Sequence, residues 1–335
     1  MISTSTTTIN HTDYKTTLGH IKEETGLIFT TQNILGFDKV DKMKDDGHHF
    51  IDLISDKPKV FVPIYLSFYH FYHDAFGEFL WQYEQMPDAK YIIDITSIAD
   101  VNPLPSYIKM FFNFLNDKKV DYQPIDFRKI NKMNINDFYF KNHESESPEI
   151  NNPSPKLYEM SQNYVKDKSI PATKKIFLSR KNFQSRDLSK LTKGRLPYEN
   201  DNRLDDEPKL QEYLKTLGFE IVIPEEFKTF QDQINCMYQA KMIMSTTSSG
   251  FTNACFMRPG STMVELITPL ISFNRVGNGV TSPISSGQEE IHHYYHLMSQ
   301  AMDHTYIGIN NKTRSTDKII ETIENNKLLK AWLSE

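Results

Sequence analysis

The chain has 335 residues, of which 39% are hydrophobic and 24% are charged, as in folded globular proteins and unlike disordered or fibrous ones. Its 38 basic and 43 acidic residues give a net charge of −5, so the charge balance does not indicate a nucleic-acid partner. The length exceeds that of a typical single domain, and we expect two domains.

The first half begins with a polar arm that extends to about Asp13. Buried strands are then predicted at residues 59–65 and 91–95, and helices at residues 70–86 and 105–115. Apolar side chains recur every four residues from Phe71 to Tyr83, which is typical of an amphipathic helix. Strands that alternate with helices in this way predict a parallel sheet.

A polar segment at residues 141–155 interrupts this alternation. It combines prolines with serine, asparagine and glutamate, a composition typical of a loop or linker. We therefore place the domain boundary here, with a first domain over residues 1–155 and a second domain over residues 156–335.

The second half repeats the alternation of strands and helices. Strands are predicted at residues 175–179, 219–224, 241–245 and 263–267, and helices at residues 207–217 and 230–240. An amphipathic helix through Ile319 and Leu328 closes the chain and is a candidate to pack back on the first domain. Both halves therefore predict an α/β fold.

The two cysteines, Cys236 and Cys255, lie in apolar segments and lack the spacing of a zinc site. Two cysteines do not build a disulfide framework, which favours a reducing compartment. Residues 1–6 are polar, unlike a signal peptide, and no stretch is long and apolar enough to span a membrane. We expect a cytoplasmic protein without a membrane span.

The turn after the strand at residues 241–245 is the segment best suited to bind a ligand. It contains Thr246, Thr247, Ser248, Ser249, Gly250, Phe251 and Asn253. Ligands of open α/β sheets bind at the carboxyl ends of strands, and the N-terminus of a following helix attracts anions. We interpret the turn as a pyrophosphate cradle. A Ser/Thr helix cap with no ligand is the alternative interpretation.

Two arginines lie between the first strand and the first helix of the second half. Arg180 follows the strand end at Ser179, and Arg203 precedes the helix that begins at Glu207. The planar guanidinium forms two parallel hydrogen bonds with phosphate oxygens, so both arginines are candidates to bind a diphosphate. Solvated surface arginines are the alternative.

His70 and Asp74 open the first predicted helix of the first half. Residues four apart share one face of a helix, so this pair could supply a general base. An ion pair on a solvated helix surface is the alternative. Either residue could be the base, with the other orienting it, and we favour Asp74 because a carboxylate is a sufficient base when proton transfer is late.

The ordered motifs of the second half resemble glycosyltransferase family 61, which includes protein O-linked mannose N-acetylglucosaminyltransferases and plant xylan arabinosyl- and xylosyltransferases. That family shows a strand ending in Ser-Arg, an Arg followed by Asn-Glu, a Gly-Phe segment, an acidic strand end, a His-Gly loop and a Val-Glu-Leu strand. The matching segments here are residues 177–181, 203–207, 217–222, 224–226, 248–254 and 259–266. His70 and Asp74 match the family's first half.

The resemblance implies the GT-B architecture, in which two Rossmann-like domains face a cleft. It implies an inverting transfer without an obligatory metal, from a nucleoside diphosphate sugar, expected to be a UDP-sugar, to a glycan-type acceptor. No Asp-x-Asp occurs in the chain, and no other cofactor is expected. The donor would bind the second domain, with Glu265 or Glu225 accepting from the ribose hydroxyls. A carboxylate that caps a helix is the alternative.

Two departures from the family pattern leave a second function open. Thr247 and Ser248 stand where the family has His-Gly, and Asp206 stands where it has Asn. A catalytically impaired relative that binds a sugar nucleotide or a glycan is therefore the alternative to an active transferase. A dinucleotide-dependent enzyme is disfavoured, because no Gly-x-Gly-x-x-Gly follows a predicted strand.

Overall fold

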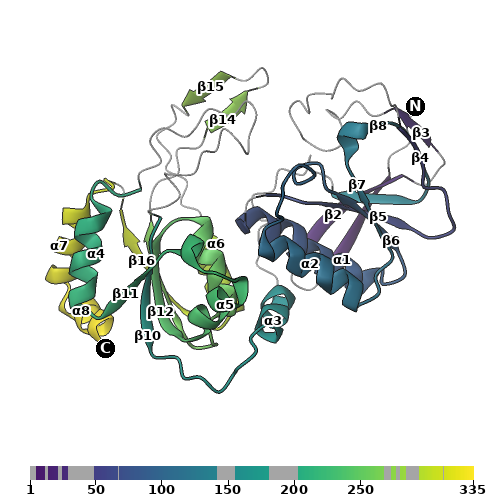
Figure 1. Cartoon of the computed structure of the whole chain (residues 1–335). Helices are drawn as coiled ribbons and strands as arrows, with labels where there is room; N and C mark the ends of the chain where they lie inside the picture. The colour runs from purple at the N-terminus through teal and green to yellow at the C-terminus, as the bar shows by residue number, and fades with distance from the viewer. Residues whose placement is uncertain are drawn as a thin grey trace. The chain divides into compact units, whose positions relative to one another are not determined.

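In the computed structural model of the chain (Figure 1), the described residues are 5–11, 14–21, 25–28, 49–66, 68–141, 155–180, 203–267, 273–276, 280–283, 294–311 and 313–335. The protein is α/β with parallel strands in its sheets, which confirms the predicted class. The chain divides into two compact units, Met1–Leu157 and Tyr158–Glu335, each with its own sheet. The polar segment predicted as a linker lies almost wholly outside the described residues.

The first unit is built on a six-stranded sheet in the order β1-β2-β9-β5-β6-β7. Its strands are β1 (Ser5–His11), β2 (Tyr14–Ile21), β5 (Lys59–Pro63), β6 (Lys90–Asp94), β7 (Tyr122–Ile125) and β9 (Phe138–Lys141). The last four are parallel, whereas β1 and β2 form an antiparallel hairpin beside β9. The prediction of a polar arm was wrong for Ser5–His11, because threonine is polar but β-branched and favours strands.

A smaller sheet in the order β3-β8-β4 completes the strands of the first unit. It comprises β3 (Thr25–Ile28), β4 (His49–Asp52) and β8 (Ile130–Ile135). Ile130 and Ile135 of β8 join a buried cluster with Phe61 and Ile92, which come from neighbouring strands of the large sheet. The cluster covers one face of the large sheet, because successive side chains of a strand point to opposite faces and Tyr91 packs on the other.

The helix predicted at residues 70–86 begins as a π-helix, η1 (His70–Gly77), and continues as α1 (Glu78–Gln85). A π-helix, with i→i+5 bonds, is wider than an α-helix and places residues five apart on nearly the same face. Phe71 and Phe76, five residues apart and fully buried, both pack on Phe111 of α2 (Ser106–Asp117), with ring centroids 5.8 and 5.0 Å away.

The second unit is built on a five-stranded parallel sheet in the order β11-β10-β12-β13-β16. Its strands are β10 (Lys174–Leu178), β11 (Phe219–Val222), β12 (Ala240–Thr246), β13 (Thr262–Ile267) and β16 (Thr305–Asn310). The chain goes from β10 to one edge and then returns to the other side of β10 at β12. This doubly wound, Rossmann-like order creates a topological switch point between β10 and β12.

Helices cover both faces of this sheet (Figure 1). One face carries α4 (Glu207–Thr216), α7 (Thr316–Asn325) and α8 (Lys327–Ser334), and the other carries α5 (Phe230–Tyr238) and α6 (Tyr294–Ala301). The helix α3 (Pro155–Asn163) spans the division between the units, and β14 (Phe273–Val276) and β15 (Val280–Pro283) form a separate hairpin.

The final helix of the chain packs on the second unit's own sheet. Leu333 of α8 is fully buried in the cluster that contains Leu214 of α4 and Ile323 of α7. Lys175 Nζ donates to the Leu333 carbonyl oxygen at 2.9 Å and to the Leu217 carbonyl oxygen at 2.6 Å, so one buried lysine caps two helix ends. The buried face of this helix therefore belongs to the second unit, where the sequence left a return to the first domain open. Within the described ranges, no helix combines the length and the hydropathy needed to cross a membrane.

Candidate functional site

The carboxyl ends of β10 and β12 meet at the switch point of the second sheet. Ser245 Oγ donates to the carbonyl oxygen of Leu178, the last residue of β10, at 3.0 Å. A Cβ atom added to Gly250 would lie 3.2 Å from Ser248 Oγ and 4.0 Å from Leu178 Cδ1. The turn after β12 therefore packs closely against the end of β10. Ligands of doubly wound sheets bind at this position.

The end of β10 is fixed to the first turn of α4 by a carboxylate. Glu207 Oε1 accepts from Ser179 Oγ at 2.5 Å and from the backbone N of Arg180 at 3.3 Å. Gln211, one turn further along α4, donates to both Glu207 Oε1 and Ser179 Oγ, at 2.9 and 3.1 Å. This cluster orients the backbone that carries Arg180 at the carboxyl edge of the sheet.

A second cluster joins the end of β12 with side chains of β13 and β16. Thr247, directly after β12, donates its hydroxyl to Glu265 Oε1 at 2.5 Å, and Tyr306 of β16 donates its hydroxyl to Glu265 Oε2 at 2.7 Å. The guanidinium of Arg203 donates to the Thr247 carbonyl oxygen. Burial raises the pKa of Glu265, while the bonds from both hydroxyls and the charge of Arg203 act against that rise.

The segment that carries Arg203 is held by the loop between β16 and α7. Asn311 Nδ2 donates to the Arg203 carbonyl oxygen at 3.0 Å, and the backbone N of Thr316 donates to Asp205 Oδ1 at 2.8 Å. Asp206 caps α4, where its carboxylate accepts from the backbone N of Lys209 at 3.0 Å. These contacts fix the position of Arg203 relative to the edge of the sheet.

The turn after β12 continues into the 3₁₀-helix η6 (Ser249–Phe256). Phe251 is fully buried, with its ring 5.0 Å from that of Tyr295, and the buried Asn253 donates to the Gly250 carbonyl oxygen at 2.8 Å. These two side chains support the turn from inside. Ser249 is exposed, whereas the buried hydroxyl of Ser248 has no hydrogen-bond partner among the described residues. An unsatisfied buried hydroxyl is costly unless a ligand or water meets it.

The remaining predicted residues of the second unit differ in exposure. Thr246, the last residue of β12, is buried. Glu265 is only 1% exposed and both its carboxylate oxygens accept from protein hydroxyls, so its geometry is that of a support for Thr247. Glu225 is exposed in the 3₁₀-helix Pro224–Glu226, directly after the edge strand β11.

The first unit carries the predicted base at the start of η1. His70 is exposed, and its ring lies 6.0 Å from the ring of Tyr65 and 5.1 Å from that of Tyr69. The backbone of Asp74 lies in the same π-helix, but its side chain is outside the described part of the chain. The pairing of His70 with Asp74 stays a prediction.

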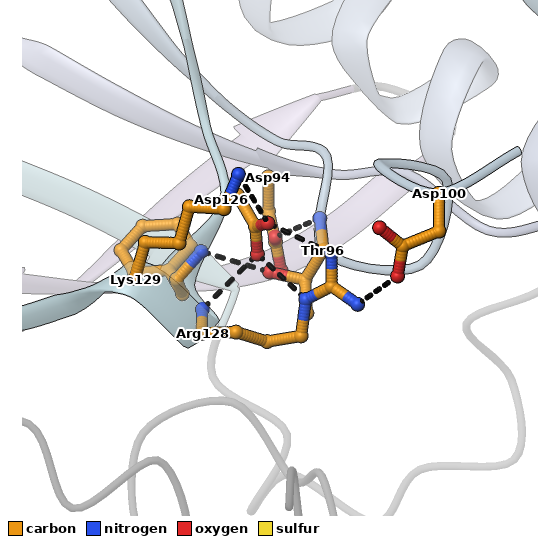
Figure 2. A network of polar contacts seen from close by, with 7 residues as sticks. Asp94, Thr96, Asp100, Asp126, Arg128 and Lys129 are labelled. Atoms are coloured by element: carbon orange, nitrogen blue, oxygen red, sulfur yellow. Dashed lines mark hydrogen bonds and ion pairs between the residues drawn. The ribbon is translucent and has the colours of Figure 1, made fainter. Parts of the chain in front are cut away.

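A polar network that the sequence did not predict lies at the carboxyl edge of the first sheet (Figure 2). Asp94, the last residue of β6, accepts from the backbone N of Thr96 at 2.8 Å. The Thr96 hydroxyl oxygen accepts from the backbone N of Phe127 at 3.0 Å, so the network joins the ends of β6 and β7. Burial raises the pKa of Asp94 to about 6, although the bonds from Thr96 lower it.

Arg128 makes most of the ionic contacts of this network (Figure 2). It forms a bidentate pair with Asp126, through Nε at 2.9 Å and Nη2 at 2.8 Å, and donates Nη1 to Asp100 Oδ2 at 2.5 Å. Lys129 Nζ lies 3.8 Å from Asp126 Oδ2. Elsewhere in the described ranges, as here, no group of three or more His, Cys, Asp or Glu side chains is placed to hold a metal ion.

The sequence matches the family described as Glycosyltransferase 61 over residues 68–264, which is more than half of the chain. The chain belongs to this family. The match begins just before η1 and ends inside β13, so it includes residues of both units. Membership identifies the protein as a glycosyltransferase, with a nucleotide-sugar donor and a glycan acceptor in general. A comparison with curated proteins found no match.

Both departures of this glycosyltransferase from the family pattern have a local function in the fold. Asp206 caps α4, and Asn at the same position would cap it equally well. Thr247 replaces an imidazole with a hydroxyl that donates to Glu265. Asp206 therefore fixes the start of α4, and the carbonyl oxygen of Thr247 accepts from the Arg203 guanidinium.

Sequence reasoning missed Tyr306 and Asp94. Tyr306 lies outside the matched residues and 41 positions from Glu265, so no local pattern connects the two. Asp94 had a signal, because a buried strand that ends in a carboxylate places that group at the ligand-binding edge of a sheet.

Proposed function

We propose that this glycosyltransferase is an inverting, metal-independent enzyme that moves a sugar from a nucleoside diphosphate sugar, with UDP as the expected nucleotide, to a hydroxyl of a glycan. The observation that carries the proposal is the convergence of Arg203, Arg180 and the 246–250 turn at the carboxyl edge of the second sheet. In the same proposal, the two units have the GT-B architecture and the protein is cytoplasmic.

The donor diphosphate requires compensation of several negative charges in a site without a metal. Arginine guanidinium groups and backbone N–H groups at the start of a helix supply this compensation, and both occur at the switch point. The buried Ser248 hydroxyl, which has no partner among the described side chains and backbone groups, adds a donor for a phosphate oxygen. We therefore expect the diphosphate to lie beyond the carboxyl ends of β10 and β12.

The acceptor hydroxyl requires a base, because the sugar carbon is attacked from the face opposite the leaving diphosphate. We assign this role to Asp74 with His70, in the first unit, with Asp74 as the group that takes the proton. We place the base in the first unit because it must approach the acceptor hydroxyl from the side of the sugar opposite the diphosphate.

The experiment is a thermal-shift screen of the protein against UDP-, GDP-, ADP- and CDP-sugars, since a bound ligand raises the melting temperature by mass action. A transfer and donor-hydrolysis assay in excess EDTA follows with the sugar nucleotide that binds. The proposal expects a shift with at least one donor and turnover that persists in EDTA.

Three other outcomes have distinct meanings. Turnover that vanishes in EDTA and returns with manganese would refute the metal-independent mechanism. Binding without any transfer or hydrolysis would favour the catalytically impaired relative. No shift with any sugar nucleotide would contradict the donor site itself.

A further inference from the structure

A continuous chain of hydrogen bonds connects Tyr306 with Arg203. The hydroxyl of Tyr306, on β16, donates to Glu265 Oε2 at 2.7 Å, and Glu265 Oε1 accepts from Thr247 Oγ1 at 2.5 Å. The carbonyl oxygen of the same Thr247 accepts from the guanidinium of Arg203. These hydrogen bonds therefore connect β16, through β13, with the carboxyl end of β12.

Gly308 provides the space for the first of these contacts. It lies opposite Glu265 in the pairing of β13 with β16, and it is on the same face of the sheet as Tyr306. A Cβ atom at position 308 would lie 3.4 Å from the Tyr306 hydroxyl and 2.7 Å from Ile267 Cδ1. Because Gly308 has no side chain, the Tyr306 ring can lie along the strand and reach the carboxylate.

Glu265 is enclosed by this arrangement. It is 1% exposed, and each of its carboxylate oxygens accepts from a protein hydroxyl. A buried carboxylate is stable only while such donors satisfy it. Loss of the Tyr306 hydroxyl would leave one oxygen unsatisfied, and the carboxylate would move toward other donors and change the orientation of Thr247.

We propose that Tyr306 is a positioning residue for the donor diphosphate. Through Glu265 it fixes Thr247, whose carbonyl oxygen holds the Arg203 guanidinium at the switch point. Glu265 therefore acts on the donor through Thr247, in place of the ribose contact expected from the sequence. This inference rests on the proposed function, because it requires that Arg203 binds the diphosphate.

The test compares two matched tyrosine variants. Tyr306→Phe removes the hydroxyl that donates to Glu265 Oε2 at 2.7 Å. The control Tyr213→Phe removes a hydroxyl that donates to Glu324 Oε1, also at 2.7 Å, on the solvent-exposed surface of the same unit. Isothermal titration measures the Kd of UDP and of uridine, with GDP and guanosine as the second pair, and thermal melting checks the fold. We expect Tyr306→Phe to weaken the nucleoside diphosphate by about 10-fold, as for one hydrogen bond to a charged group. Nucleoside binding should stay unchanged, and Tyr213→Phe should change neither.

The double variant Tyr306→Phe/Arg203→Ala tests the connection itself. If Tyr306 acts through Arg203, the double variant binds the diphosphate as weakly as Arg203→Ala alone, because residues in one network are not additive. If Tyr306→Phe melts at too low a temperature for titration, Thr247→Val replaces it in this comparison. That variant removes the hydrogen bond from Thr247 Oγ1 to Glu265 Oε1.

The failure of this inference differs from the failure of the proposed function. Wild-type protein that binds none of the nucleotides of the screened donors would refute both. Wild-type binding that Arg203→Ala weakens but Tyr306→Phe leaves intact would refute only the positioning role. Equal losses for nucleoside and nucleoside diphosphate, or additive losses in the double variant, would also refute it.

Discussion

In the first unit, the Arg128 guanidinium at the carboxyl edge of the sheet is bound by the carboxylates of Asp126 and Asp100. In the second unit, the edge carboxylates of Glu207 and Glu265 accept instead from hydroxyl groups of Ser179, Thr247 and Tyr306. Each of these edges is formed by the carboxyl ends of parallel strands, where α/β sheets bind their ligands.

The difference matters for the chemistry that each edge favours. At the second edge, hydroxyls satisfy the carboxylates, and the Arg203 guanidinium reaches a backbone carbonyl, so the edge suits an anionic diphosphate. At the first edge, Arg128 is already paired with Asp126 and Asp100, and Lys129 lies 3.8 Å from Asp126. Cations that are already paired with carboxylates attract a diphosphate less strongly, so this edge suits a neutral acceptor that must lose a proton. Variants in the two units should therefore affect different kinetic constants.

The largest effect is expected in the first unit, at the base. Asp74→Asn keeps the size of the side chain and removes its charge, so turnover should fall by at least about 100-fold, the usual contribution of a positioned base. The Kd of the donor should stay within about 2-fold, since no donor contact changes. Steady-state kinetics and titration of the donor measure the two quantities.

His70→Ala provides the second arm of that test, and Asp117→Asn, at the end of α2, is the surface control. If both Asp74→Asn and His70→Ala keep wild-type turnover, the base lies elsewhere and the pair is only a contact on the helix surface.

A smaller effect is expected in the second unit, on donor affinity. Arg203→Ala should weaken a nucleoside diphosphate by about 10- to 100-fold, the range for hydrogen bonds to a charged group. Arg203→Lys should recover little of this loss, because an ammonium cannot form the bidentate contact. Isothermal titration measures both variants.

Arg128→Ala is the matched arginine of the first unit. It should leave the Kd of the nucleoside diphosphate unchanged. An equal loss in Arg128→Ala and Arg203→Ala would mean that the contrast between the two edges does not separate their functions.

The next effect is on stability and depends on pH. The pKa of Asp94 is raised to about 6 by burial, above its unfolded value of about 4, so the folded state binds the extra proton between these values. Asp126 contributes to the rise and Arg128 opposes it. The free energy of unfolding should therefore fall as pH rises from 4 to 6, by about 2–3 kcal/mol relative to Asp94→Asn.

Urea unfolding of the wild type and of Asp94→Asn between pH 4 and pH 7 measures this difference. Asparagine keeps the acceptor for the backbone N of Thr96 and does not titrate, so the two stability curves should separate with pH. A constant difference across this range would show that Asp94 has an ordinary pKa.

The smallest effect concerns Asp206, at the N-cap of α4. Asp206→Asn, which restores the residue typical of the family, should change the free energy of unfolding by less than about 0.5 kcal/mol, because both side chains cap well. Asp206→Ala should cost about 1 kcal/mol. Thermal or urea unfolding measures both, and a large loss in Asp206→Asn would indicate that the charge itself is needed.

Much of this architecture follows from local sequence patterns. Apolar runs predicted β5, β6 and β12 within a few residues, and a strand end followed by Ser179 and Arg180 placed these side chains at the correct edge. The strand β16 escaped prediction because Gly308 interrupts the run that contains Tyr306, Ile307 and Ile309. Contacts between β13 and β16, including Tyr306 with Glu265, depend on tertiary pairing that no local period encodes.

The π-helix η1 is a feature that the spacing of apolar residues could not reveal. The repeat of four residues from Phe71 to Tyr83 predicts a helix but not its type, because the same repeat runs through both the π-helix η1 and the α-helix α1. The side chain of Asp74 lies outside the described residues, so the catalytic pair stays a prediction from sequence.

The central claim is that the donor diphosphate binds at the switch point of the second sheet. The most direct measurement is a crystal structure of the protein with UDP, or with the nucleoside diphosphate that the thermal-shift screen selects. We expect phosphate oxygens within about 3 Å of the Arg203 guanidinium and of the backbone N–H groups around Ser248 to Gly250. A diphosphate bound at the first sheet, beside Asp94 and Arg128, would contradict it.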